Sequence, residues 1–172
     1  MSLDSMHELL IEELQDLYSA EQQLVKALPK IAEHVVTPSL RSALESHLRE
    51  TEGHVGRLEA AFTALGERAS SKKCKGMEGL IDEGSDRASK RGSEAVRDAG
   101  IIAAAQRVEH YEIAAYGCAI AFARLMGHQQ VVALLEETLA EEEEASEKLS
   151  ALAEDEVNQH AFAVSTAMHG GH

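Results

Sequence analysis

The stretch Gln106–Gly117, QRVEHYEIAAYG, raises the question that leads to the fold, because it places two carboxylates on an otherwise apolar helical stripe. Steps of three and four residues along a helix return to the same face. The stripe through this stretch runs Ile102, Ala105, Glu109, Glu112, Tyr116, Ala119, Ala123 and Met126. A charged carboxylate buried without a partner costs several kcal/mol. Glu109 and Glu112 therefore require a compensating partner inside the protein.

The composition predicts an all-α protein of one domain. The 172 residues include two prolines and no tryptophan, and the β-branched residues are scattered rather than clustered. The formal net charge of −14 disfavours nucleic acid and anionic membranes as partners and favours cations. We find no signal peptide, basic targeting segment or long apolar run, so we expect a cytoplasmic protein. Cys74 and Cys118 match no metal-binding pair and are expected to be reduced thiols.

The periodic segments predict a bundle of four long helices. Their approximate ranges are 5–36, 37–65, 93–126 and 128–157. The loop near Thr37 and the break at Gly127 are so short that each must join antiparallel neighbours. The basic, glycine-punctuated segment between the two hairpins has room for one short helix. These features predict a ferritin-like four-helix bundle with one long crossover carrying a short extra helix.

The apolar period is lost near the C-terminus. We therefore expect the bundle to occupy residues 1–158 and a flexible, histidine-containing tail to occupy residues 159–172.

Each long helix interrupts its apolar stripe with acid near its midpoint. Midpoints of antiparallel helices of similar length lie at about the same depth, so these carboxylates should converge on one small volume. Like charges at that depth would repel unless they were protonated or neutralised, and the stripes offer only Arg57 nearby. Divalent metal ions bound by carboxylate and imidazole are the better explanation. The acids are Glu21, Glu50, Glu109, Glu112 and Glu142.

Position along the helices suggests a role for each ligand. Glu50 and Glu142 are expected to bridge two metal ions, and the other acids to be terminal ligands. His54 lies one turn beyond Glu50 and is preferred as the imidazole ligand. His47 remains open as a ligand, as a partner of a ligand, or as a core histidine. The predicted metal site is therefore Glu21, Glu50, His54, Glu109, Glu112 and Glu142.

Three tyrosines lie within a turn of the acids, namely Tyr18, Tyr111 and Tyr116. They are expected to serve in packing, with hydrogen bonding to the acids or a redox role as the alternatives. In the acidic run of the last long helix, the apolar stripe selects Glu142. Glu143, Glu144 and Glu147 are expected to face solvent, and Glu141 is borderline.

Five ordered segments resemble the YciE/YciF-like family of bacterial ferritin-like stress proteins. They are DLYSAEQQL (16–24), SHLRETEGHVGRLE (46–59), KKCKGMEGLIDEG (72–84), AAQRVEHYEIAAYG (104–117) and LLEETLAEEEEASEKL (134–149), and the likeness extends over about Met6–Ala153. The resemblance implies a rubrerythrin-like bundle, usually paired as a homodimer, with a di-metal site and no firmly assigned reaction. Carried over residue by residue, the implied site is Glu21, Glu50, Glu109, Glu112 and Glu142.

One departure from ferritin-like proteins bears on the metal site. Such proteins commonly place histidine three residues after a ligating glutamate. Here those positions hold Gly53 and Ala145, and Ser146 follows the latter, where relatives tend to carry aspartate. The second metal is therefore expected to be rich in oxygen ligands and more loosely held.

Three functions follow as hypotheses. The first is a stress-associated protein whose two metal ions, iron or alternatively manganese, form a carboxylate centre that oxidises Fe(II) with oxygen or peroxide. The second is a non-catalytic, dimeric structural protein whose metal stabilises the bundle. The third is a metal-free interaction module in which the inward acids are protonated or paired.

Overall fold

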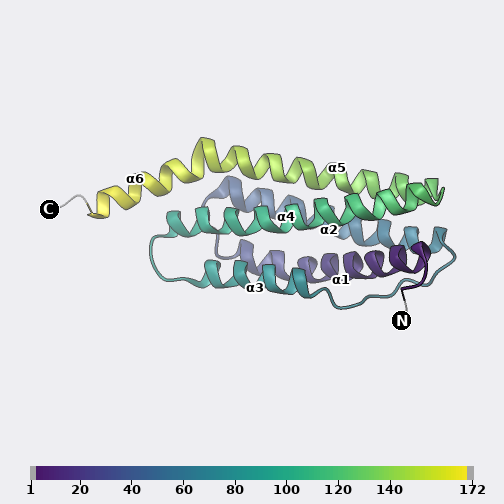
Figure 1. Cartoon of the computed structure of the whole chain (residues 1–172). Coiled ribbons are helices and arrows are strands. Elements are labelled where there is room, and N and C mark those ends of the chain that lie inside the picture. The colour runs from purple at the N-terminus through teal and green to yellow at the C-terminus, as the bar shows by residue number, and fades with distance from the viewer. Residues whose placement is uncertain (1–2, 170–172) are drawn as a thin grey trace.

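The protein is an all-α bundle, seen in a computed structural model that describes residues 3–169, with side chains to residue 167 (Figure 1). Over that range the chain forms helices and connecting loops and has no strand. The helices are α1 (Met6–Ala32), α2 (Pro38–Ala64), α3 (Lys75–Ser89), α4 (Glu94–Leu125), α5 (Gln129–Leu152), the π-helical turn η1 (Ala153–Val157) and α6 (Asn158–His169).

Local sequence signals set the ends of the long helices. Ser5 caps the N-terminus of α1 with two hydrogen bonds. Its side-chain hydroxyl accepts a hydrogen bond from the backbone N–H of Glu8, and the Glu8 carboxylate accepts one from the backbone N–H of Ser5. Pro38 begins α2, where its missing N–H costs nothing. Gly66 and Gly127 follow α2 and α4 with φ of 73° and 78°, a left-handed conformation that glycine adopts without strain.

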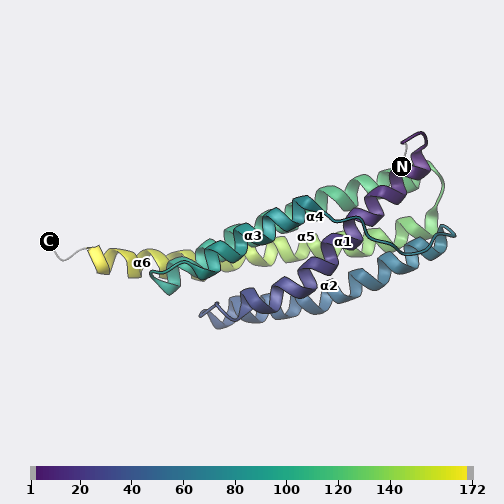
Figure 2. The same cartoon turned by 90° about the horizontal axis from the view of Figure 1, so that it is seen from below.

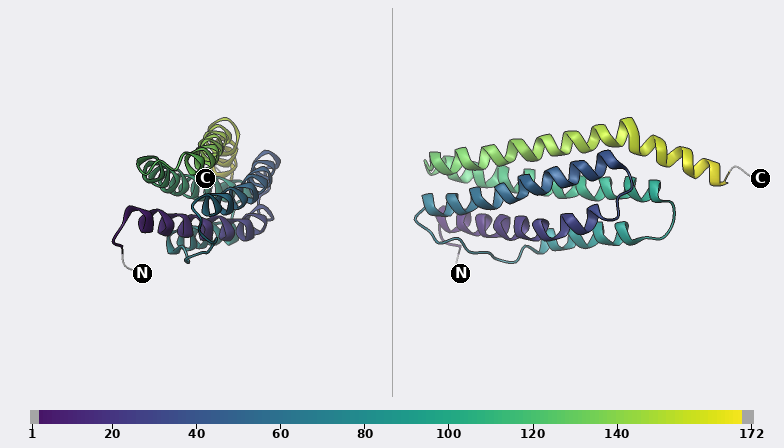
Figure 3. Two further views of the ribbon diagram at one scale, coloured as in Figure 1. Left: turned by 90° about the vertical axis from the view of Figure 1, so that its right-hand side faces the viewer. Right: turned by 180° about the vertical axis from the view of Figure 1, so that it is seen from behind.

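Two antiparallel hairpins, α1–α2 and α4–α5, form the bundle, and α2 also packs against α5 and α1 against α4. The chain between the hairpins returns along the bundle, as Figure 2 shows from below and Figure 3 from behind. Its helical part, α3, packs against α1 and α4. The predicted four-helix bundle with one crossover and a short extra helix is therefore confirmed.

The interior consists of two apolar clusters separated by a polar layer. The first cluster includes Leu24, Leu28, Leu44, Ile101 and Leu149, and the second includes Leu14, Leu58, Phe62, Tyr116 and Leu135. On α2, α4 and α5, the buried histidines and glutamates lie between the residues that contribute to the two clusters. On α1, Glu21 lies next to Ala20, where the helix passes from the second cluster to the first. The polar layer thus crosses the middle of the bundle.

The prediction that helical structure ends near Val157 is wrong. The chain continues through η1 into α6, which packs against α4 and extends beyond the other helices (Figure 1). A π-helical turn holds more residues than an α-helical one and shifts the apolar face, which explains why the period is lost in the sequence. Val157 and Ala161 are nevertheless buried. Residues 170–172 of the expected tail lie outside the described residues.

Within the described part of the chain, none of the helices is long and apolar enough to cross a membrane.

Candidate metal centre

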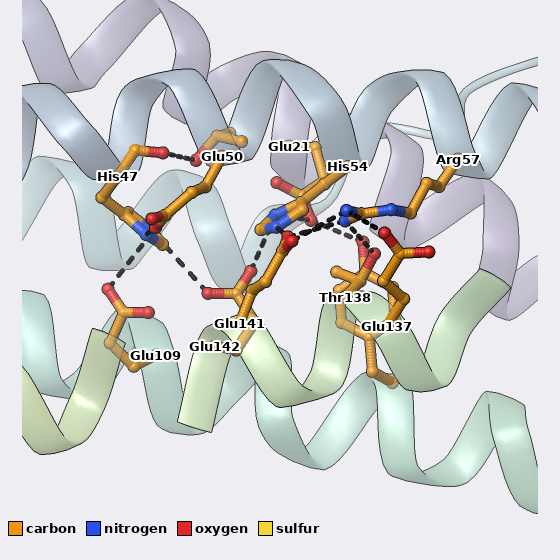
Figure 4. Close-up of polar contacts among 12 residues, drawn as sticks. Glu21, His47, Glu50, His54, Arg57, Glu109, Glu137, Thr138, Glu141 and Glu142 are labelled. Atoms are coloured by element: carbon orange, nitrogen blue, oxygen red, sulfur yellow. Dashed lines mark hydrogen bonds and ion pairs between the residues drawn. The ribbon is translucent and has the colours of Figure 1, made fainter. Parts of the chain in front are cut away.

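Six buried side chains form the polar layer between the two apolar clusters. Each is 6% exposed or less, and they come from all four long helices. Figure 4 labels five of them, namely Glu21, His47, His54, Glu109 and Glu142. They divide into two groups that share Glu142, and within each group one ligand atom per residue lies within 4.8 Å of the others. We call Glu21, His54 and Glu142 the inner group, and His47, Glu109, Glu112 and Glu142 the outer group.

The inner group is fully enclosed. His54 Nδ1 lies 3.0 Å from Glu142 Oε1 and 3.3 Å from Glu21 Oε1, and all three side chains have no exposed surface. The hydroxyl of Tyr116 donates a hydrogen bond to Glu21 Oε1. One imidazole nitrogen and two carboxylates from α1, α2 and α5 therefore face one another at coordination range.

The outer group lies closer to solvent. His47 Nε2 is 3.5 Å from Glu109 Oε1 and 3.7 Å from Glu142 Oε2. A cavity of about 40 Å³ beside this group is lined in part by His47, Glu50, Glu109 and Lys148. The side chain of Glu50 is 29% exposed and that of Lys148 is 52% exposed, so this cavity lies between the outer group and partly exposed charged side chains.

Each histidine has a second contact, in which the ring nitrogen that faces away from the buried acids lies against a carboxylate outside the polar layer. For His54 that carboxylate is Glu141, with Oε2 2.8 Å from Nε2. Arg57 fixes Glu141 through contacts of 2.6 and 2.8 Å. For His47 the carboxylate is Glu50, with Oε2 3.4 Å from Nδ1. Histidines that ligate metals are usually held in this way, which fixes the ring and leaves the other nitrogen free to coordinate.

The buried polar atoms fit a metal centre better than a closed hydrogen-bond network. Among the described residues, both oxygens of Glu112, both oxygens of Glu142 and one oxygen each of Glu21 and Glu109 have no hydrogen-bond partner. His47 Nε2 and His54 Nδ1 also make no hydrogen bond, and their contacts with the buried carboxylates are ion pairs of 3.0 to 3.7 Å. Buried polar atoms in native proteins are normally satisfied, so this concentration points to a bound group. Carboxylate oxygen and imidazole nitrogen are ligands that divalent metal ions accept.

Electrostatics in the absence of a cation are unfavourable. Burial raises the pKa of Glu112 well above its usual value, and the charges of Glu142 and Glu21 raise it further. Burial likewise raises the pKa of Glu109 and of Glu21. Without metal, these groups therefore tend to retain protons.

The histidines carry the balancing charge. Burial disfavours the charged imidazole of His54, but its contacts with Glu142 and Glu21 raise its pKa to about 10. Burial acts in the same way on His47, where the charge of Glu109 and the hydrogen bond to Glu50 raise the pKa to about 9. Both imidazoliums in turn lower the pKa of Glu142 against the effect of burial. Without metal, the layer is therefore held together by protons.

The structure brings together five of the six residues that the sequence nominated as metal ligands, and Glu50 is the exception. Glu50 lies outside both groups and contacts the outward-facing nitrogen of His47. His47, which the sequence left open, belongs to the outer group. Both groups thus contain a histidine from α2, although α5 supplies none near Glu142.

The other polar residues near the layer have separate partners. Glu141, borderline in the sequence, is half-buried against His54 and Arg57, whereas Glu143, Glu144 and Glu147 are exposed as expected. Arg57 pairs with Glu137 and Glu141 rather than with the buried acids. Of the three tyrosines, Tyr116 contacts the layer, Tyr111 donates to Asp16, and Tyr18 donates to Glu59. Both cysteines are free.

Comparison with known proteins places the chain in a family. The family described as a domain of unknown function, DUF892, matches residues 5–162. The chain belongs to this family. It is 40% identical to protein YciF of Escherichia coli strain K12 over 162 residues, which cover 94% of this chain and 98% of YciF.

Solved structures of similar proteins share the fold. The crystal structure of the E. coli stress protein YciF superposes with a TM-score of 0.87 at 39% identity, covering 91% of this chain and 99% of that one. YcfI from Rhodopseudomonas palustris, provisionally described as a structural protein, gives a TM-score of 0.84 at 43% identity, covering 87% and 97%. A protein from Xanthomonas campestris, at 23% identity and a TM-score of 0.69, covers 96% and 99% and shows the fold alone.

Proposed function

We propose that the buried layer binds two divalent metal ions and that the protein is a DUF892 member with a carboxylate-bridged di-metal centre. The observation that carries the proposal is the pair of ligand groups sharing Glu142, in which six carboxylate oxygens and two imidazole nitrogens have no hydrogen-bond partner among the described residues. The four carboxylates in these groups balance the charge of two divalent cations. Metal binding would thus replace the protons that hold the layer together otherwise.

The residues take distinct parts in this proposal. Glu21 and His54 would hold one ion, His47, Glu109 and Glu112 would hold the other, and Glu142 would bridge the two. Glu50, nominated from the sequence as a second bridge, is placed to orient His47, as Glu141 is placed to orient His54. Tyr116 would hold the Glu21 side chain in place through the hydrogen bond that its hydroxyl donates to Oε1, the oxygen that also lies 3.3 Å from His54 Nδ1.

We further propose that the physiological metal is iron, with manganese as the alternative, and that the centre oxidises Fe(II) with oxygen or peroxide. Two iron(II) ions supply the two electrons that reduce dioxygen to hydrogen peroxide, or hydrogen peroxide to water. Support comes from the chemistry of the ligand set and from the description of the relative YciF as a stress protein. A homodimer, as the family resemblance implies, and a cytoplasmic location, as the sequence predicts, complete the proposal.

Metal analysis of protein purified without an affinity tag tests the proposal. Aerobic addition of Fe(II) is expected to give uptake of about two irons per chain, since two ligand groups are present. The shared ligand makes Glu142→Gln the decisive variant, and its exposed neighbour on α5, changed in Glu143→Gln, is the matched control. Glu142→Gln should lose iron uptake and accelerated oxidation, while Glu143→Gln should keep both. Equal behaviour of the two variants would contradict the proposal.

A structural role is the second candidate, and the description of the relative YcfI favours it. In this case metal would raise the melting temperature of the bundle without any turnover of Fe(II). Melting curves with and without chelator, recorded beside the oxidation assay, separate the two functions. A metal-dependent melting temperature together with uncatalysed oxidation would select the structural role.

A further inference from the structure

A second, apolar cavity of about 30 Å³ reaches the candidate metal centre from the side of α3. Helices α1, α2, α3 and α4 all contribute to its wall, which includes Leu28, Leu44, Gly84, Ala104, Val108 and Glu109. Glu109 is the only polar residue in this wall, and it belongs to the outer group. An apolar space therefore ends at a candidate metal ligand.

Gly84 leaves part of this space open. A Cβ atom at Gly84 would lie 3.7 Å from Ala104 Cβ and 3.7 Å from Ile31 Cδ1, which is ordinary van der Waals contact. Alanine would thus fit, and within a helix it is more favourable than glycine. Gly76 on the same helix differs, because its Cβ would come within 2.7 Å of the Tyr111 ring. Gly84 is therefore explained by the space it leaves and not by a close approach.

The size and lining of the cavity restrict what can occupy it. Its volume exceeds the roughly 10–15 Å³ that one water molecule requires, but it has room for no more than a few atoms. A buried water needs two to four polar partners, and this wall offers only the Glu109 carboxylate. The space is too small for an organic substrate. A nonpolar diatomic gas satisfies both limits.

We propose that this cavity binds dioxygen and delivers it to the metal centre at Glu109. Delivery of dioxygen to a metal centre rests on the proposed function. Binding of dioxygen in the cavity does not depend on it. The cavity lined in part by His47, Glu50 and Lys148 lies on the α5 side of Glu109. The two cavities share Leu44 and Glu109, so the gas would reach the centre from a different side than the one that carries these charged side chains.

Dioxygen is paramagnetic, so NMR of the metal-free, methyl-labelled protein under dioxygen pressure detects where it resides. Methyl groups of Leu24 and Ile101, at the cavity, should relax faster than those of Leu14 and Leu58 in the second apolar cluster. All four residues are 2% exposed or less, so the comparison is matched for burial. Equal relaxation enhancement in the two pairs would overturn the proposal.

Two glycine variants on α3 give the matched test. Gly84→Ala places a methyl group in the cavity and should remove the enhancement at Leu24 and Ile101. Gly79→Ala adds the same methyl group at a position where the added Cβ meets no atom within 4 Å beyond the neighbouring backbone of its own helix. This variant should leave the relaxation enhancement at Leu24 and Ile101 unchanged. Ala104→Val narrows the cavity from α4 and should repeat the loss. Enhancement that persists in both Gly84→Ala and Ala104→Val would also overturn the proposal.

A failure of this inference can be distinguished from a failure of the proposed function. The NMR experiment contains no metal, so its outcome stands even if the protein binds no iron. If iron is oxidised, Gly84→Ala should slow the reaction with limiting dioxygen and leave the equilibrium uptake of Fe(II) unchanged. Unchanged oxidation at limiting dioxygen would count against the route.

Discussion

The inner and outer groups of the polar layer differ in how firmly their histidines are held. His54 has no exposed surface, and its Nε2 lies 2.8 Å from a carboxylate oxygen of Glu141. Arg57 in turn donates a hydrogen bond to Glu141 and holds it in place. His47 contacts Glu50 at 3.4 Å, and Glu50 is itself partly exposed. Preorganised ligands bind more tightly because less freedom is lost on binding. The inner group should therefore bind the tighter ion, and the outer group the one that exchanges.

The largest expected effect comes from removing the histidine of one group. His54→Gln and His47→Gln should each reduce metal uptake from about two ions to about one, because each variant takes the only nitrogen ligand from its group. The ion that remains should be tighter in His47→Gln, which keeps the inner group intact. Isothermal titration calorimetry with Mn(II) under anaerobic conditions measures both quantities.

The comparison between the inner and outer groups is tested by which variant, His47→Gln or His54→Gln, keeps the more tightly bound ion. A tighter remaining ion in His54→Gln would reverse the assignment of the inner and outer groups. Loss of both ions in either variant would show that the two groups act as one unit.

An intermediate effect is expected from the carboxylates that orient the histidines. Glu141→Gln should weaken the inner ion by about 10- to 100-fold, the usual loss when a partner of a metal-bound histidine is removed. Glu50→Gln should weaken the outer ion by about tenfold or less, because its contact is longer and more exposed. Metal titrations of the two variants measure the difference.

Glu137→Gln is the control for Glu141→Gln. Glu137 pairs with the same arginine, with 2.8 Å between the closest atoms, and its side chain is 61% exposed. Within the described residues, the ion-pair partners of His54 are Glu21, Glu141 and Glu142, and Glu137 is not among them. Equal losses in the Glu137 and Glu141 variants would assign the effect to Arg57 and not to orientation of the imidazole.

The smallest effect is a dependence of stability on pH that differs between metal-free and metal-bound protein. Folding raises the pKa of His47 to about 9 and of His54 to about 10, from about 6.5 in the unfolded chain. Between these values the folded state binds more protons than the unfolded state. The free energy of unfolding of the metal-free protein should therefore fall as pH rises, by at most about 1.4 kcal/mol per pH unit for each histidine.

Metal binding removes this dependence because the ligands have already lost their protons. The difference in melting temperature between metal-bound and chelator-treated protein should thus grow from pH 6.5 to pH 9. Calorimetric melting of both forms across this range measures it. A difference that stays constant would show that neither histidine loses a proton to the metal.

Much of the candidate site follows from periodicity alone. Residues on one helical stripe stay on one face for the whole length of a straight helix, so Glu21, Glu109, Glu112 and Glu142 could be placed in the interior. Similar helix lengths and short loops then brought them to the same depth. Periodicity did not predict the C-terminal helix α6, because the π-helical turn η1 shifts the apolar face between α5 and α6.

The sequence by itself determined the bundle, its crossover and the convergence of acids at its centre, because these depend on helical spacing and loop length. Only the tertiary structure decided between Glu50 and His47, which lie less than one turn apart on α2. A small rotation of that helix, set by its packing against α1 and α5, selects which side chain enters the layer. The same packing turns Glu141 toward His54 and leaves the apolar cavity beside Glu109.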